Sequence, residues 1–214
     1  MGRMARKPRN EFPGAVVHVF ARGVRKHAIY VDDVDRQSYV LLLGQVVLRQ
    51  QWRCLAYCLM DNHVHLLLET PQPNLAAGMH RLHGLHAQGF NKRHNHSGHV
   101  FQGRYGAVAV RKDGQLLQVA RYIALNPVEA GLREDAADWP WGSHAAVVGG
   151  MAPRWLDVTR LLGYFGADGG EPRERYLDFV RSPAPSGSAG VPGRRRGGPR
   201  RRRPPGPPRS RRRP

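Results

Sequence analysis

Cysteine is scarce in this sequence: its 214 residues include only Cys54 and Cys58. Two cysteines cannot build a disulfide-rich secreted scaffold or a four-cysteine zinc site, and we expect both as small buried residues on one face of a strand. Long apolar runs are also missing. The longest early run, 15–21, is interrupted by His18 and is far shorter than the about 20 residues of a membrane span. The sequence therefore predicts a cytoplasmic protein with no membrane partner.

Acidic residues are the third scarcity. The chain carries 34 Lys and Arg against 16 Asp and Glu, a formal net charge of +18. Eleven arginines and no acid lie in 182–214, so residues 1–181 keep 23 basic and 16 acidic residues. This excess favours a polyanionic partner, nucleic acid ahead of membrane, and a place at the nucleoid. A basic protein with no nucleic-acid role is the alternative.

The periodicity of apolar residues predicts the secondary structure. Strands are expected at 14–23, 51–59, 62–69 and 105–111, and helices at 34–50, 74–92, 115–126 (ended by Pro127), 154–165 and 171–181. A turn at 60–62 makes the middle strands a hairpin. The order β-α-β-β-α-β-α predicts an α+β fold with a ferredoxin-like (split βαβ) antiparallel sheet and helices on one face.

A pair of histidines lies on the strand 62–69. Alternation puts His63, His65, Leu67 and Glu69 on one face of that strand, so the two imidazoles can share one metal ion. Buried histidines whose ring nitrogens are satisfied within the core remain the alternative. A second pair, His94 and His96, lies in a polar loop that does not fix ligand directions, and we interpret it as solvated loop histidines.

The helix 115–126 carries a tyrosine at the edge of its apolar stripe. Tyr122 and Asn126 are four residues apart and lie on the same flank, which suits side chains that face a cleft beside the core. A tyrosine at such a position is either a packing residue or a nucleophile, and the spacing does not decide between them.

Four stretches together resemble one known family, in its order and spacing. They are FPGAVVHV at 12–19, AYCLMDNHVHLLLETP at 56–71, GHVFQGRY at 98–105 and RYIALNPVEAGL at 121–132. The sequence is similar to the REP-associated tyrosine transposases, a branch of the single-tyrosine HUH nucleases. The resemblance covers about residues 10–150, and we predict residues 1–150 as the catalytic domain. A short helical extension at 151–182 and a disordered Arg, Pro and Gly-rich tail at 183–214 are expected to follow.

The resemblance implies a role for each matching residue. His63 and His65 match the paired metal-binding histidines, Tyr122 the catalytic tyrosine, and Asn126 the third metal ligand. It implies Mg²⁺ or Mn²⁺ as cofactor, a 5′-phosphotyrosine intermediate, and single-stranded DNA that folds into REP-like hairpins as substrate. Asp61 stands where the family more often has proline, and adds a carboxylate beside the expected metal. The protein is expected as a monomer or a homodimer.

Basic side chains are the candidates for DNA contacts. They are Arg3, Arg6, Lys7, Arg9, Arg104 and Arg121. A frayed solubilising arm is the alternative for the N-terminal group. The arginine tail is expected to bind the DNA backbone whatever its sequence, so removing 183–214 should flatten the salt dependence of binding and spare site choice. Two rival functions stay open: a hairpin-binding module without catalysis, and a metal phosphodiesterase that uses activated water.

Overall fold

A computed structural model describes residues 11–166 and 171–183 of the chain. The strands are β1 (Ala15–Arg22), β2 (Arg53–Met60), β3 (His63–Thr70) and β4 (Gly106–Val110). The helices are α1 (Asp33–Gln50), α2 (Leu75–His94), α3 (Asp113–Glu129), α4 (Ser143–Gly149), α5 (Val158–Leu162) and α6 (Pro172–Arg181). Short 3-10 helices are η1 (Val24–Lys26), η2 (Ala136–Asp138) and η3 (Gly163–Phe165).

The sheet has the strand order β2-β3-β1-β4, and every neighbouring pair is antiparallel. Helix α1 carries the chain from β1 across β3 to the far edge, and α2 carries it from β3 to the other edge at β4. The β2–β3 hairpin turns at Asp61 and Asn62, with Met60 opposite His63. These features confirm the predicted α+β, ferredoxin-like sheet.

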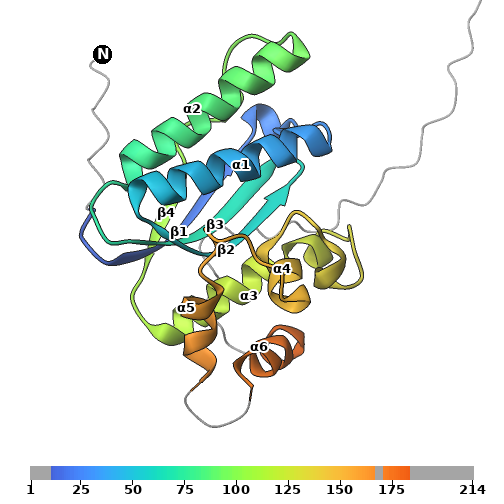
Figure 1. The fold of residues 1–214 in the computed structure, drawn as a ribbon. Coiled ribbons are helices and arrows are strands. Elements are labelled where there is room, and N and C mark those ends of the chain that lie inside the picture. The colour runs from blue at the N-terminus through green and yellow to red at the C-terminus, as the bar shows by residue number, and fades with distance from the viewer. Residues whose placement is uncertain (1–10, 167–170, 184–214) are drawn as a thin grey trace, which may run out of the picture.

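Helices cover both faces of the sheet, which corrects the prediction of one helical face. In Figure 1, α1 and α2 lie on one side of the strands, and α3 to α6 lie on the other. One core cluster joins the sheet to α1 and α2, and a second joins it to α3, α5 and α6. The pattern was misleading because β3 is buried along most of its length and has apolar side chains on both faces, as expected of a strand that is covered on both sides.

The two cysteines lie on opposite faces, contrary to the prediction. The register between β2 and β3 shifts between Cys54 and Ala56. Because a shift of one residue reverses the faces of all later side chains, Cys54 packs in the α1–α2 core and Cys58 in the α3 core. Both are buried and neither forms a disulfide, as expected.

Helix α3 does not end before Pro127, as predicted, but continues through it to Glu129. Pro127 has no amide hydrogen to donate to the Ile123 carbonyl, so the last turn of α3 lacks one hydrogen bond. The end is closed instead by the amides of Ala130 and Leu132, which donate to the carbonyls of Asn126 and Pro127. Asn126 is therefore held in helical geometry rather than in a loop.

The segment after residue 150 completes the α3 layer. Phe165, Tyr176 and Val180 are buried against α3 residues in the second core. Helix α4, at Ser143–Gly149, forms within a stretch that the sequence pattern left irregular. The N-terminal arm, with Arg3 to Arg9, and the tail beyond Pro183 lie outside the described residues.

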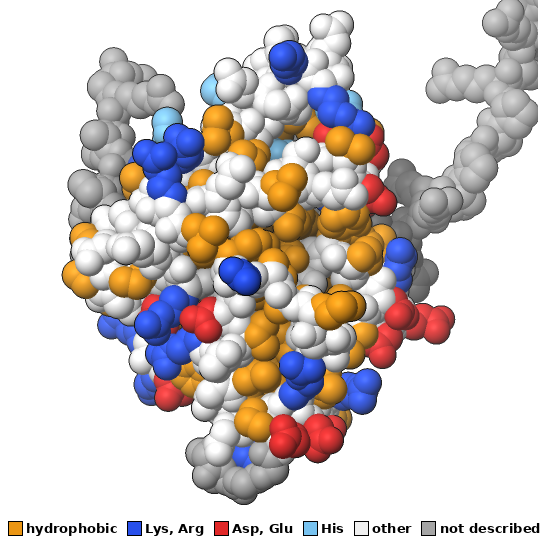
Figure 2. All heavy atoms as spheres, in the orientation of Figure 1, with side chains coloured by type: hydrophobic (Ala, Val, Ile, Leu, Met, Phe, Trp, Pro, Cys, Tyr) orange, Lys and Arg blue, Asp and Glu red, His pale blue; other side chains and the backbone are white. Residues whose placement is uncertain are grey.

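The outer side of α1 exposes three apolar side chains among polar ones. Val34, Leu41 and Leu48 are at least half exposed along this helix, and Figure 2 shows hydrophobic side chains gathered across the middle of this face. Within the described part of the chain, no helix is long and apolar enough to cross a membrane.

Candidate active site

The two histidines of β3 point to the α3 side of the sheet. Val64 and Leu66, which alternate with them, pack in the α1–α2 core, so His63 and His65 face the opposite layer. Their ring centroids are 5.1 Å apart. The alternation predicted from the sequence is confirmed. The helix that faces the two rings is α3, which carries Tyr122 and Asn126.

His63 is oriented by its neighbour in the hairpin turn. Asn62 Nδ2 donates to the carbonyl of Lys26, which leaves Asn62 Oδ1 as the acceptor for His63 Nδ1 at 2.7 Å. Burial lowers the pKa of His63 to about 4, so the ring is neutral at pH 7 and its one proton sits on Nδ1. The Nε2 atom of His63 therefore presents a lone pair.

Asn126 faces that lone pair with a second one. Its Nδ2 donates to the carbonyl of Tyr122 at 3.0 Å, which fixes Oδ1 as the atom turned toward the histidine. Oδ1 lies 3.5 Å from His63 Nε2. Two acceptors cannot hydrogen-bond to each other, and a cation between them would satisfy both.

His65 is the inner member of the pair and lies against Tyr122. The two ring centroids are 5.3 Å apart in an edge-to-face arrangement. His65 is 4% exposed, and burial holds its pKa well below the ordinary value. The phenol ring of Tyr122 is half-buried. A neutral imidazole and a tyrosine that solvent can reach thus share one corner of the site within a single chain.

Two functional candidates were missed by the sequence. His18 on β1 is fully buried, and its Nε2 lies 3.0 Å from Nδ1 of His65. Arg22, on the same face of β1, is directly opposite His63 across the strand pair. Alternation along β1 put both on one face, but only the β1–β3 pairing shows which residues they meet. The charge of Arg22 contributes to the low pKa of His63 and of His65.

Arg121 is not placed for the DNA contact that we predicted. Its side chain is buried, donates to the carbonyl of Pro183 at 3.3 Å and lies over the ring of Phe179. This guanidinium ties the end of the described chain to α3. Arg104 is exposed. It lies two residues after Gln102, whose backbone amide donates to the carbonyl of Arg22. A DNA contact by Arg104 stays a prediction.

The other polar candidates are engaged elsewhere. His94 is not a solvated loop residue, as predicted, but ends α2, and its Nε2 lies 2.9 Å from an Asp35 oxygen. The exposed ring of His96 lies nearly parallel to that of Phe90. Asp61 lies beside the site, as expected, and one of its oxygens accepts from Arg36 at 2.5 Å. This ion pair draws the carboxylate toward Arg36.

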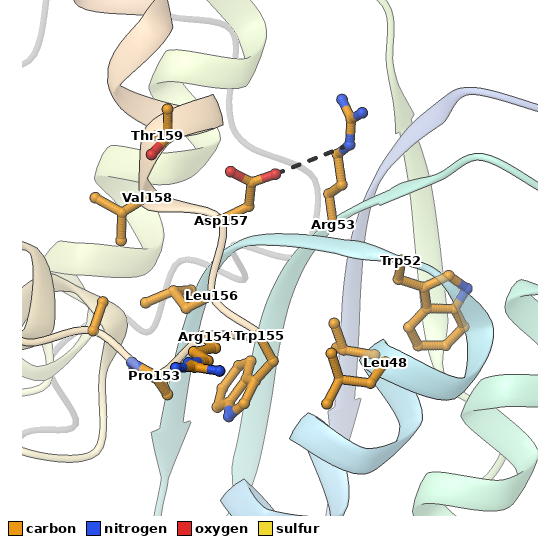
Figure 3. A pocket seen from close by; sticks show the side chains of 12 residues that line it. Leu48, Trp52, Arg53, Pro153, Arg154, Trp155, Leu156, Asp157, Val158 and Thr159 are labelled. Carbon is orange, nitrogen blue, oxygen red and sulfur yellow. Dashed lines mark ion pairs between the residues drawn. The ribbon is translucent and has the colours of Figure 1, made fainter.

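The pocket in Figure 3 is separate from this constellation. It is lined by the end of α1, the start of β2 and the segment 152–159, with Arg53 3.9 Å from Asp157 and the Trp155 indole at its wall. Arg53 begins the strand whose other end, Met60, lies opposite His63. The pocket is thus at the far end of the sheet from the histidines.

The donor set fits a hard or borderline divalent cation. Among the described residues, no group of three or more His, Cys, Asp or Glu side chains is arranged to hold a metal ion. An amide counts as a ligand as well, and His63, His65 and Asn126 supply two neutral nitrogens and one oxygen. The facing lone pairs on His63 and Asn126 are the observation that favours a cation here.

Comparison with known proteins agrees with this geometry. A family model described as "Transposase IS200 like" matches residues 13–126, which include His63, His65, Tyr122 and Asn126. The chain belongs to the IS200-like transposase family. A curated REP-associated tyrosine transposase of Haemophilus influenzae is 30% identical over 100 residues, which are 41% of this chain and 56% of that protein. The chain thus spans little more than half the length of that relative.

One solved structure shows the same fold. A REP-associated tyrosine transposase bound to a REP hairpin has a TM-score of 0.57, with 18% identity over 70% of this chain and 89% of that one. A protein of Deinococcus radiodurans R1 described as a transposase has a TM-score of 0.40, with 21% identity over 56% of this chain and 95% of that one. The resemblance to REP-associated tyrosine transposases that the sequence motifs indicated is confirmed.

Proposed function

We propose that this chain is a metal-dependent endonuclease and strand transferase for single-stranded DNA that folds into hairpins, with Tyr122 as its nucleophile. The observation that carries the proposal is the meeting of β3 and α3. The ring of His65 lies 5.3 Å from that of Tyr122, and His63 Nε2 faces Asn126 Oδ1 in the same chain. These four side chains come from positions 63 to 126, and packing alone does not require their chemistry.

Tyr122 forms the covalent bond. Its oxygen attacks the phosphorus of the scissile phosphodiester and its proton is released, while the bond from phosphorus to the 3′ oxygen breaks. The products are a 5′-phosphotyrosine and a free 3′-hydroxyl. Because the intermediate keeps the energy of the phosphodiester, a 3′-hydroxyl can attack it and restore Tyr122 without ATP. Nicking and joining then use the same residues in opposite directions.

His63, His65 and Asn126 hold the cofactor, Mg²⁺ or Mn²⁺. When bound, such a cation polarises the scissile phosphate and stabilises the charge on its non-bridging oxygens. The three ligands are neutral, so they leave the charge of the cation for the phosphate. Burial, which keeps both imidazoles neutral at pH 7, preserves one lone pair on each ring for this task.

Hairpin DNA is the substrate that best fits the chain. The similar transposase of known structure is bound to a REP hairpin, and this chain has its fold. The excess of basic over acidic residues suits a polyanion. An unpaired strand beside a hairpin can bring its phosphate to a half-buried tyrosine without the opening of a duplex.

An adduct assay tests the proposal. The full chain is incubated with Mn²⁺ and a labelled single-stranded hairpin oligonucleotide, and protein–DNA adducts that survive denaturation are resolved on a gel. The wild type should form the adduct, and Tyr122→Phe and His63→Ala should not. Tyr164→Phe is the matched control, because this tyrosine lies on η3 and packs under Arg160 instead of against the histidines.

The outcomes separate the rival functions. Cleavage without an adduct points to a hydrolase that activates water, in which Tyr122 only packs. Binding without cleavage points to a hairpin-binding module. Adduct formation by Tyr122→Phe would remove this tyrosine from the mechanism.

A further inference from the structure

His18 is buried in a position that packing alone does not explain. It is 0% exposed, and its neighbours along β1, Val17 and Val19, are apolar residues of the opposite core. Its ring lies at 26° to that of His65 with a centroid distance of 5.2 Å, and its centroid is 6.0 Å from that of Tyr122. Its Nδ1 is buried with no hydrogen-bond partner among the described residues. An apolar ring would fill the same space at lower cost.

The contact between the two rings contains a single proton. His18 Nε2 and His65 Nδ1 are 3.0 Å apart. Both rings are buried, and a neutral imidazole carries one N–H and one lone pair. One of the two nitrogens in the contact donates and the other accepts.

The direction of this hydrogen bond decides whether His65 can be a ligand. If His18 Nε2 donates, the proton of His65 sits on Nε2, and the ring has no lone pair left for a cation. If His65 Nδ1 donates, its Nε2 lone pair is free. The same logic already holds at His63, where the Asn62 side chain accepts the Nδ1 proton. Ligand histidines generally depend on such a partner for their second nitrogen.

We propose that His18 is a positioning residue of the cation site. Its Nε2 accepts a hydrogen bond from the Nδ1–H of His65, and this keeps the Nε2 lone pair of His65 for the cation. This rests on the proposed function, and adds to it a residue that touches neither cation nor DNA. In this arrangement the proton of His18 is on Nδ1, the atom left without a partner. His18 is thus held in a costly tautomer that the bound cation stabilises.

Cation affinity tests this role apart from activity. Mn²⁺ binding to the full chain is measured by electron paramagnetic resonance of free Mn²⁺ in wild type, His18→Phe, His18→Gln and His86→Phe. His18→Phe should weaken binding by about 10–100-fold, as for other partners of ligand histidines. His18→Gln, whose side-chain oxygen can accept, should recover part of the loss. His86→Phe is the control, because this equally buried histidine is bonded to the Ile29 carbonyl on the other face.

The results distinguish this inference from the proposed function. Wild type that binds no Mn²⁺ overturns the cation site and the role of His18 with it. Wild-type affinity in His18→Phe, with loss in His65→Ala, overturns the role of His18 alone. If His18→Phe does not fold, ring ¹⁵N spectra of the Mg²⁺-loaded wild type decide. They should show the protons of His18 and His65 on Nδ1, and a proton on Nε2 of either ring contradicts the proposal.

Discussion

At the scale of single residues, the chemistry of the site depends on which lone pairs stay free. Asn62 Oδ1 accepts a hydrogen bond from Nδ1 of His63, and the Tyr122 carbonyl accepts one from Nδ2 of Asn126. These two hydrogen bonds leave His63 Nε2 and Asn126 Oδ1 as acceptors that face each other. Each is made by a neighbour close in sequence, one and four residues away. The local backbone of the hairpin turn and of α3 therefore prepares the ligands before any cation is present.

Arg22 should support the reaction with its charge. It lies opposite His63 on the site face of β1, is exposed, and forms no ion pair within the described ranges 11–166 and 171–183. We expect Arg22→Ala to slow adduct formation by about tenfold or more, since a fixed cation near the phosphate stabilises developing charge. Arg22→Lys should retain part of the rate, because lysine keeps the charge but loses the planar fork of donors.

Initial rates of adduct formation measure this effect. Arg49→Ala is the control, because Arg49 lies in the last turn of α1, away from the histidine face. An unchanged rate in Arg22→Ala contradicts the expectation.

At the scale of elements, helix α2 is held against the sheet by a close approach. A Cβ placed on Gly78 would lie 2.2 Å from the ring of Trp52, whose Nε1 is bonded to Asn74 Oδ1 at 2.6 Å. The indole is therefore anchored and cannot simply move away. On the same helix, a Cβ on Gly84 meets nothing within 4 Å. The two glycines have opposite environments in one element.

Alanine at these positions should change stability in opposite directions. Gly78→Ala is expected to lower the free energy of unfolding by about 1–3 kcal/mol, because overpacking outweighs the gain in helix propensity. Gly84→Ala should raise it by up to about 1 kcal/mol, since an exposed helical glycine gains propensity and meets no clash. Urea denaturation of both variants measures the difference, and equal shifts would contradict the packing argument.

Most element boundaries could be predicted from the sequence, and the exceptions have local causes. Strands β1 and β3 and helix α1 begin and end within one residue of the predicted ranges. The bulge in β2 at Cys54 and Ala56 could not be predicted, because it depends on pairing with β3 rather than on composition. The continuation of α3 through Pro127 was also missed, because the contacts that close the helix end come from later residues.

At the scale of the whole molecule, buried neutral histidines should make the fold sensitive to acid. The pKa of His18 and of His63 is lowered to about 4, against about 6.5 in an unfolded chain. Between these values the unfolded state binds more protons, so stability is full above pH 6.5 and is lost as the pH falls toward 4. For fully buried His18 alone the loss is on the order of 3 kcal/mol.

Urea denaturation of the metal-free chain between pH 7 and pH 4.5 measures this dependence. His18→Phe should show a smaller loss of stability on acidification than wild type, because one of the buried groups no longer takes up a proton on unfolding. Equal free energies of unfolding at the two pH values in wild type would contradict the expectation.

The arginine tail should act on DNA affinity rather than on site choice. Removing residues 184–214 takes away eleven arginines but keeps Pro183, whose carbonyl accepts from Arg121. For each phosphate that the shortened chain no longer neutralises, the slope of log affinity against log salt should fall by about 0.7 for a single strand. Binding at several salt concentrations and mapping of the cleaved bond check this. An unchanged slope would contradict it, as would a moved cleavage site.

The sequence by itself determined the order of the elements, the shared face of His63 and His65, and the four-residue spacing of Tyr122 and Asn126. Each of these follows from the period of a strand or a helix, which is local. Only the tertiary structure decided that His18 and Arg22 join them, that Arg121 turns to Pro183, and that helices cover both faces of the sheet. The reason is physical: strand pairing and layer packing join residues distant in the chain, and no local period records which strands become neighbours.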